Sequence, residues 1–235
     1  MNNQEFLQVI SNSFRDFLES GTSRSTTKLK PLHGAVANDI AERLGEDYKV
    51  FSQGYGTNKE KKILGRYIDK RVDITIETKE GKSVCGIAVK FVMQNYSQNS
   101  NNYFENMLGE TANIRCEGIP YFQIFIILDK LPYYKKNKTI KHWEEFTAHN
   151  IEKYVKLSKD DINVYFHTPN KTLIYVVHIP DNTEIKTAEE YFSYYKKENP
   201  NVTLTKNSYD QFDNSVIFND YEKFIDKIYY TIKAL

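Results

Sequence analysis

The segments Val72-Asp73-Ile74-Thr75-Ile76 and Val84-Cys85-Gly86-Ile87-Ala88-Val89-Lys90-Phe91 decide the fold of this chain. Both are rich in β-branched and apolar residues, and the polar turn Lys79-Glu80-Gly81-Lys82 separates them, so they predict a β-hairpin. Side chains of a strand alternate between its two faces. In the first strand, the dry face therefore holds Val72, Ile74 and Ile76, and the other face holds Asp73, Thr75 and Glu77.

The second strand of this hairpin carries a lysine among apolar residues. Alternation places Ala88 and Lys90 on one face and Cys85, Ile87, Val89 and Phe91 on the other. Burying an unpaired ammonium group is costly. A lysine at position 90 therefore requires a specific reason.

Helices and strands are expected on both sides of the hairpin. Apolar residues at helical spacing predict an opening amphipathic helix through Phe6, Val9, Ile10, Phe14, Phe17 and Leu18. A second helix is expected over about 33–44, ended by Gly45, and a first strand over 48–53. The Asn-rich stretch 94–102 is expected to lead into a third helix, which Gly118 and Pro120 end. The apolar run 121–128 is typical of a central strand covered on both faces.

The C-terminal half is less regular. The pattern predicts a helix over 142–157 and a hairpin formed by 162–167 and 172–179. A capping box at 187–190 begins a helix to about Lys197, the stretch 200–213 is expected to be loop, and Asn219 is expected to cap a last helix. Together the elements predict an α/β fold with a central mixed β-sheet flanked by helices on both faces. We expect a single domain over 1–235, with a core at about 33–130 and a helical and hairpin part at about 131–235.

Composition excludes several classes of protein. The formal charge of +1 gives no overall electrostatic preference for nucleic acid, so the local distribution of charge matters instead. No apolar run approaches eighteen residues and the N-terminal segment has no basic-then-apolar pattern, so neither a membrane span nor a secretory signal is expected. The five histidines lack zinc-ligand spacing, and Cys85 and Cys116 are expected to be buried free thiols of a reducing cytosol.

The hairpin resembles the core of the PD-(D/E)XK nucleases, the fold of many Type II restriction endonucleases. Their motif is an Asp at the start of one strand and an acid-x-Lys on the next. Asp73 matches the Asp, and Ala88-Val89-Lys90 matches the acid-x-Lys except that alanine occupies the acidic position. Val72 stands where proline often precedes the Asp, and the resemblance covers roughly 50–128.

This resemblance implies hydrolysis of a DNA phosphodiester assisted by Mg²⁺. Magnesium prefers carboxylate, phosphate and water oxygens, and the implied metal site consists of Asp73, position 88 and the backbone carbonyl of Val89. Lys90 is expected to orient or deprotonate the attacking water, or to offset charge on the phosphorane. Glu42 is expected to add an acid from the preceding helix, with Asp39 as the second choice, although both acids equally suit the polar side of an amphipathic helix.

Alanine at position 88 leaves the implied metal site one carboxylate short. Three explanations account for it. The native acid has been replaced, another acid such as Glu77, Glu105 or Glu110 has taken its place, or the protein is a relative that binds DNA without cutting it. The candidate catalytic positions that the resemblance implies are Asp73, Ala88, Lys90 and Glu42.

Two segments are candidates for contact with double-stranded DNA. Six basic residues against two acidic ones give the stretch 59–71 a local charge of +4, which suits phosphate binding by Lys59, Lys61, Lys62, Arg66, Lys70 and Arg71. Asn and Gln can pair with adenine in the major groove, which makes the polar run after the lysine strand the candidate for base reading, namely Asn95, Gln98, Asn99, Asn101 and Asn102. A further basic and aromatic patch spans 133–138 and Lys141.

The sequence therefore predicts a Mg²⁺-dependent, sequence-specific DNA endonuclease in the cytoplasm of a prokaryote. A homodimer is expected because palindromic sites match two-fold protein symmetry. The alternatives are a DNA-binding protein and a repair or recombination nuclease of the same fold without sequence preference. A domain in which Asp73 and Lys90 are unrelated is the fourth reading.

Overall fold

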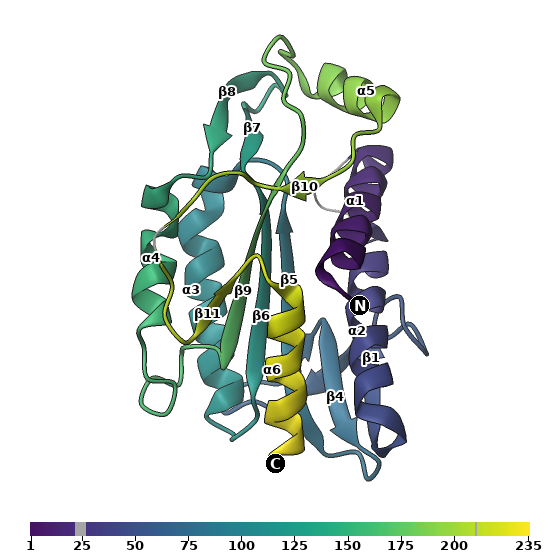
Figure 1. Ribbon diagram of the computed structural model, residues 1–235, viewed down its shortest axis with the longest axis vertical. Coiled ribbons are helices and arrows are strands. Elements are labelled where there is room, and N and C mark those ends of the chain that lie inside the picture. Colours follow the sequence, from purple (N-terminus) through teal and green to yellow (C-terminus); the bar gives the residue numbers. More distant parts are fainter. Residues whose placement is uncertain (22–26, 210) are drawn as a thin grey trace.

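A mixed β-sheet of seven strands forms the centre of the protein (Figure 1). The computed structural model describes residues 1–21, 27–209 and 211–235. The strand order is β1 (Tyr48–Ser52), β4 (Ile74–Thr78), β5 (Ser83–Val92), β6 (Tyr121–Leu128), β9 (Lys171–His178) and β10 (Thr203–Leu204), and β11 (Val216–Phe218) also pairs with β9. Strands β1, β4 and β5 are antiparallel, and β5, β6 and β9 are parallel. The expected mixed sheet is confirmed, and so is the antiparallel hairpin of β4 and β5 within it.

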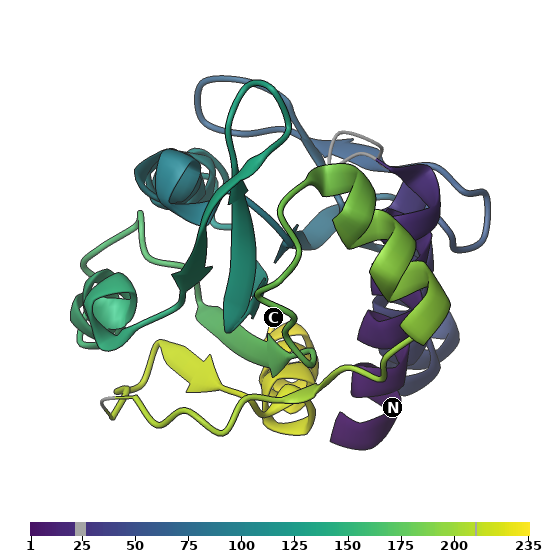
Figure 2. The same cartoon turned by 90° about the horizontal axis from the view of Figure 1, so that it is seen from above.

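Helices cover both faces of this sheet. Helices α1 (Asn3–Ser20), α2 (Lys30–Leu44) and α6 (Tyr221–Lys233) lie on one side, and α3 (Tyr96–Arg115) and α4 (Ala148–Ser158) lie on the other (Figure 2). The central strand β6 shows why, since every residue of it is buried. Phe122 packs edge-on against Phe224 of α6, whereas Phe125 packs against Tyr154 of α4. The near-continuous apolar run at 121–128 thus reflects burial on both faces.

Smaller elements complete the chain. Strands β7 (Lys130–Tyr134) and β8 (Ile140–Glu145) form a separate antiparallel pair, and α5 (Ala188–Glu198) begins at the expected capping box of Thr187 and Glu190. Short 3₁₀ turns span Thr27–Leu29 and Gly45–Asp47. No helix in the described part of the chain is both long and apolar enough to cross a bilayer.

The first strand of the decisive hairpin is interrupted at Asp73. Strand β3 (Lys70–Val72) pairs with β2 (Lys61–Ile63) in a two-stranded sheet of its own, and β4 begins only at Ile74. The outward face predicted for β4 is also covered, because Thr75 is 0 % and Glu77 2 % exposed. Asp73 therefore sits at the junction of two sheets rather than on the open face of one.

The Asn-rich stretch 94–102, which was expected to precede the third helix, mostly belongs to it. Helix α3 begins at Tyr96, because the Glu144 carboxylate accepts hydrogen bonds from the backbone N–H groups of Tyr96 (2.7 Å) and Ser97 (3.0 Å). An acid 48 residues away in sequence thus caps the helix.

Several expectations in the C-terminal half were wrong. Residues 140–145 form β8, so α4 begins at Ala148 rather than at position 142. Residues 162–167 form turns rather than a strand, because the buried Arg115 guanidinium donates to the carbonyls of Ile162, Tyr165 and Thr168. Strand β9 instead pairs in parallel with β6.

Two smaller corrections concern capping and a cysteine. The N-cap of α6 is Asp220, and Asn219 accepts a hydrogen bond from the backbone N–H of Val176 instead. Both cysteines are free thiols, and Cys85 is buried, but Cys116 is exposed rather than buried.

Candidate functional site

A cavity of about 340 Å³ lies where β3, β5, β6 and α3 meet. Its lining includes Asp73, Ala88, Val89 and Lys90, the residues of the sequence motif. Glu110 of α3 and Tyr121 and Gln123 of β6 also belong to the polar part of the wall. The motif residues therefore converge on one cavity, together with an acid from a helix.

Asp73 is fixed by its position between two sheets. Its Oδ2 atom accepts a hydrogen bond from the backbone N–H of Val89 (2.7 Å), and its backbone carbonyl accepts one from the Ser52 hydroxyl (2.7 Å). Burial, as the largest cause, and the charge of Glu110 together raise the pKa of Asp73 to about 6, although the Val89 N–H, Lys70 and Lys90 oppose this shift. Burial thus outweighs the nearby positive charges of Lys70 and Lys90, which favour the ionised form of this acid.

Lys90 brings a positive charge to the cavity. Its ammonium lies 4.5 Å from the centre of the Tyr103 ring, a cation–π contact that holds the side chain against α3. Burial lowers the pKa of Lys90, and the charges of Asp73 and Glu110 act in the opposite direction. The three charged groups are therefore close enough to influence one another.

Position 88 offers space rather than charge. Ala88 is paired with Gln123 on the neighbouring parallel strand β6, and both line the cavity. Glu110 reaches the same cavity from α3, where it forms an ion pair with Lys70 and accepts a hydrogen bond from the Tyr121 hydroxyl (3.4 Å).

The other two acids considered as substitutes for position 88 lie elsewhere. The buried Glu77 carboxylate is paired with Lys61 and also accepts from the Ser83 hydroxyl, and it does not line the cavity. Glu105 is exposed on α3 and is likewise outside the lining. Of the three acids, Glu110 is the one that the fold brings to Asp73 and Lys90.

Glu42 and Asp39 do not join the motif residues in the cavity lining. The Glu42 carboxylate accepts a hydrogen bond from Asn38 on its own helix. Asp39 binds the N-terminal ammonium (2.8 Å), Arg43 and the Tyr221 hydroxyl, which ties three helices together. Helix α2 nevertheless offers a different group to Asp73, namely the imidazole of His33.

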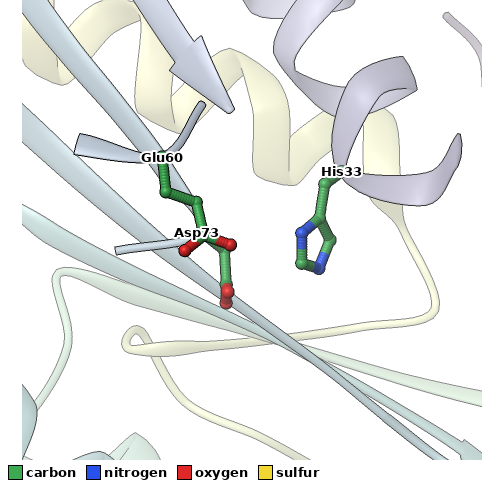
Figure 3. A group of neighbouring side chains, drawn as sticks. All are labelled: His33, Glu60 and Asp73. Carbon is green, nitrogen blue, oxygen red and sulfur yellow. The ribbon is translucent and has the colours of Figure 1, made fainter. Parts of the chain in front are cut away.

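His33, Glu60 and Asp73 place one ligand atom each within 4.8 Å of one another (Figure 3). They come from α2, from the loop between β1 and β2, and from the β3–β4 junction. Burial raises the pKa of Glu60, and the charge of Asp73 raises it further. Sequence reasoning missed this cluster because 27 and 13 positions separate its members, and the one hint was an acid inside the basic stretch 59–71.

The basic stretch is divided between structural pairs and exposed charges. Lys61 is paired with Glu77, Lys70 with Glu110, and Arg66 with Glu117 (3.6 Å). Lys59, Lys62 and Arg71 are exposed, and Arg71 lines the cavity beside Asp73.

The polar run after β5 has mixed roles. Asn95 accepts a hydrogen bond from the backbone N–H of Tyr134 (2.7 Å) and donates to Gln98, which serves the β7–α3 contact. Asn101 lies 3.5 Å from the Lys153 ammonium, and Asn102 is exposed on α3. Gln98 and Asn99 line a second, larger hollow of about 1060 Å³ that shares Lys90 and Tyr103 with the cavity.

Comparisons with known proteins give no family for this chain. No protein-family model and no curated protein matches the sequence. Among solved structures, Pyrococcus furiosus SfsA in complex with Ca²⁺ matches with a TM-score of 0.27 and 12 % sequence identity. The match covers 68 % of this chain and 58 % of that one, so this chain spans less than two thirds of its length.

Proposed function

We propose that this chain is a divalent-cation-dependent DNA endonuclease whose catalytic groups are Asp73, Lys90 and Glu110. The observation that carries the proposal is the shared cavity, which brings together a carboxylate from a sheet junction, a lysine from β5 and a second carboxylate from α3. Lys90 is partly buried, and the charges of Asp73 and Glu110 oppose the effect of burial on its pKa, a combination that is typical of a functional site.

The donor set suits a hard divalent cation. Asp73 and Glu110 supply carboxylate oxygens, and the backbone of Val89 is fixed beside Asp73 by its N–H group. Burial and the charge of Glu110 both disfavour the ionised form of Asp73, a situation that a bound cation relieves. Such a cation, for which Mg²⁺ is the expected choice, supplies Lewis acidity toward a phosphate oxygen.

The protein groups then have distinct roles. Asp73 and Glu110 bind the cation and orient the attacking water through hydrogen bonds. Lys90, held by the Tyr103 ring, offsets the negative charge that grows on the phosphoryl oxygens. Ala88 leaves room on the wall between Lys90 and Gln123, and Glu110 takes over the function of the missing acid.

A polynucleotide fits the surroundings better than a small phosphoester. The larger hollow continues from Lys90 past Gln98, Asn99 and Lys138, and Arg71 borders the cavity itself. Each phosphate that these basic groups neutralise adds salt-dependent affinity. We propose a sequence-specific enzyme of the restriction type, acting as a homodimer in a prokaryotic cytoplasm.

Cleavage of supercoiled plasmid in Mg²⁺ or Mn²⁺ tests this proposal. We expect Asp73→Asn and Glu110→Gln to reduce the cleavage rate by at least about 100-fold, the usual effect of losing a group that stabilises the transition state. Glu105→Gln is the matched control on the same helix, and its rate should stay within about twofold. Discrete fragments support site-specific cutting, whereas a smear supports a nuclease without sequence preference.

The Ala88→Glu variant separates the explanations for position 88. If Ala88→Glu cuts DNA and the unaltered chain does not, alanine has replaced a native acid at position 88. In that case Glu110 does not perform the function of that acid. If neither form cuts unmethylated DNA, the enzyme proposal fails. DNA binding with a steep salt dependence would then favour a protein that binds without cutting.

A further inference from the structure

We propose that His33, Glu60 and Asp73 form a divalent-cation site that prefers a first-row transition ion such as Mn²⁺ to Mg²⁺. This inference rests on the proposed function only in sharing Asp73 with the catalytic cavity. It adds two ligands that lie outside the sequence motif, and it changes the expected identity of the cation.

The geometry brings the three ligand atoms together from separate elements. They lie within 4.8 Å of one another, and Figure 3 shows the His33 ring beside the Glu60 and Asp73 carboxylates. Metal–ligand bonds of about 2.0–2.2 Å place neighbouring ligands about 3 Å apart, so small side-chain rotations close the site. The Oδ2 atom of Asp73 is held by the backbone N–H of Val89, which limits how far this carboxylate can turn away.

The backbone around the site is closely packed. A Cβ atom on Gly34 would lie 2.3 Å from the carbonyl oxygen of Gly54, and one on Gly54 would lie 2.1 Å from the carbonyl oxygen of Lys30. These two glycines let the start of α2 rest directly on the loop that leads to Glu60. The start of α2, which carries His33, is therefore packed tightly against the beginning of the loop that leads to Glu60.

His33 is the unusual member of the cluster. The residue is 6 % exposed, and its Nε2 atom is buried without a hydrogen-bond partner. Burial lowers the pKa of His33 to about 4, which the charge of Glu60 only partly opposes, so the ring is neutral near pH 7. The neutral His33 ring therefore adds no positive charge beside the Glu60 and Asp73 carboxylates, and a bound cation would supply one.

The donor types favour transition ions. Carboxylate oxygens accept Mg²⁺ and Mn²⁺ alike, whereas an imidazole nitrogen is a good ligand for first-row transition ions and a poor one for magnesium. Replacing a carboxylate by His33 in the ligand set therefore raises the affinity for Mn²⁺ relative to Mg²⁺. Asp73 belongs both to this cluster and to the lining of the cavity that contains Lys90.

Direct binding of Mn²⁺ to the full chain tests this site without DNA. Titration followed by the EPR signal of free Mn²⁺ should give one strong site per chain, at least tenfold tighter than the Mg²⁺ affinity measured by competition. Pulsed EPR of the bound ion should show coupling to an imidazole nitrogen. Both His33→Ala and Glu60→Gln should weaken Mn²⁺ binding at least tenfold, and His33→Ala should remove the nitrogen coupling.

Two control variants have no ligand in the cluster. Glu42 is on the same helix as His33, about two and a half turns away and so on the opposite face. His149 is a surface histidine whose side chain is 89 % exposed. Both Glu42→Gln and His149→Ala should bind Mn²⁺ as the unaltered chain does. Because His33 is buried, the circular dichroism of His33→Ala is first compared with that of the unaltered chain. If His33→Ala does not fold, the partly exposed Glu60→Gln variant is used for the test instead.

The outcomes separate this inference from the proposed function. Three results overturn the inference even if the protein cuts DNA. The first is a folded Glu60→Gln variant whose Mn²⁺ affinity is within twofold of that of the unaltered chain. The others are bound Mn²⁺ without nitrogen coupling and no binding at millimolar Mn²⁺. Mn²⁺ bound through His33 in a protein that cuts no DNA leaves the inference standing and rejects the nuclease.

Discussion

Lys28 is a basic side chain that the fold removes from water. It is 4 % exposed, and its ammonium lies 4.9 Å from the centre of the Phe17 ring. Burial, followed by the nearby charge of Lys90, lowers the pKa of Lys28 from 10.5 to about 8. Between these two pH values the unfolded chain binds one proton more than the folded chain, so stability rises with pH in this range.

This shift predicts how stability depends on pH. The free energy of unfolding of the unaltered chain, relative to Lys28→Met, should be constant below pH 8 and should rise by about 1.4 kcal/mol per pH unit up to about pH 10.5. Urea denaturation of both proteins from pH 7 to 10.5 measures this difference, in which the titration of the tyrosines cancels. Parallel curves would contradict the burial of a charged Lys28.

At the scale of the element, the contact between α2 and the loop after β1 depends on Gly34. A Cβ atom there would meet the Gly54 carbonyl at 2.3 Å, and Gly54 itself has φ = +79°, so neither side can yield easily. We expect Gly34→Ala to lower the free energy of unfolding by about 1–3 kcal/mol through overpacking. It should also weaken Mn²⁺ binding, because His33 is the preceding residue.

Gly109→Ala is the matched control for Gly34→Ala, because it is the same substitution at a helix position with open space. Gly109 lies in α3, and an added Cβ atom meets nothing within 4 Å. Gly109→Ala should stabilise the protein by about 0.4–1 kcal/mol, because alanine restricts the unfolded chain and favours the helix. Thermal denaturation of the two variants should thus shift in opposite directions, and a shift in the same direction would argue against the close contact of α2.

At the scale of the whole molecule, the N-terminus and the start of the last helix meet at Asp39. The N-terminal ammonium of Met1 and the hydroxyl of Tyr221 both lie 2.8 Å from its carboxylate, and the Arg43 guanidinium lies 3.1 Å away. Tyr221 also stacks on Phe6 with ring centres 4.1 Å apart. Helices α1, α2 and α6 are thereby joined on one face of the sheet (Figure 1).

Removing one hydroxyl measures this junction. Tyr221→Phe keeps the stacking and loses the hydrogen bond to the buried Asp39, which should cost about 1–2 kcal/mol of unfolding free energy. Tyr230→Phe on the same helix is the control. Tyr230 is 66 % exposed, so loss of its hydroxyl should change the free energy of unfolding by less than about 0.5 kcal/mol. Equal midpoints in urea for the two variants would show that the Asp39 junction contributes little.

The sequence by itself determined the mixed sheet, the opening helix, the buried strand β6 and the meeting of Asp73 with Lys90 in one cavity. These follow from local signals, because hydrophobic periodicity and a tight turn act between residues close in the chain. The helix start at Tyr96 and the turns at 162–167 depend instead on Glu144 and Arg115, whose side chains arrive from distant elements. Only the tertiary structure could bring Glu110 into the cavity lined by Asp73 and Lys90, or His33 and Glu60 to Asp73, because nothing in the local pattern encodes contacts between separate helices, loops and strands.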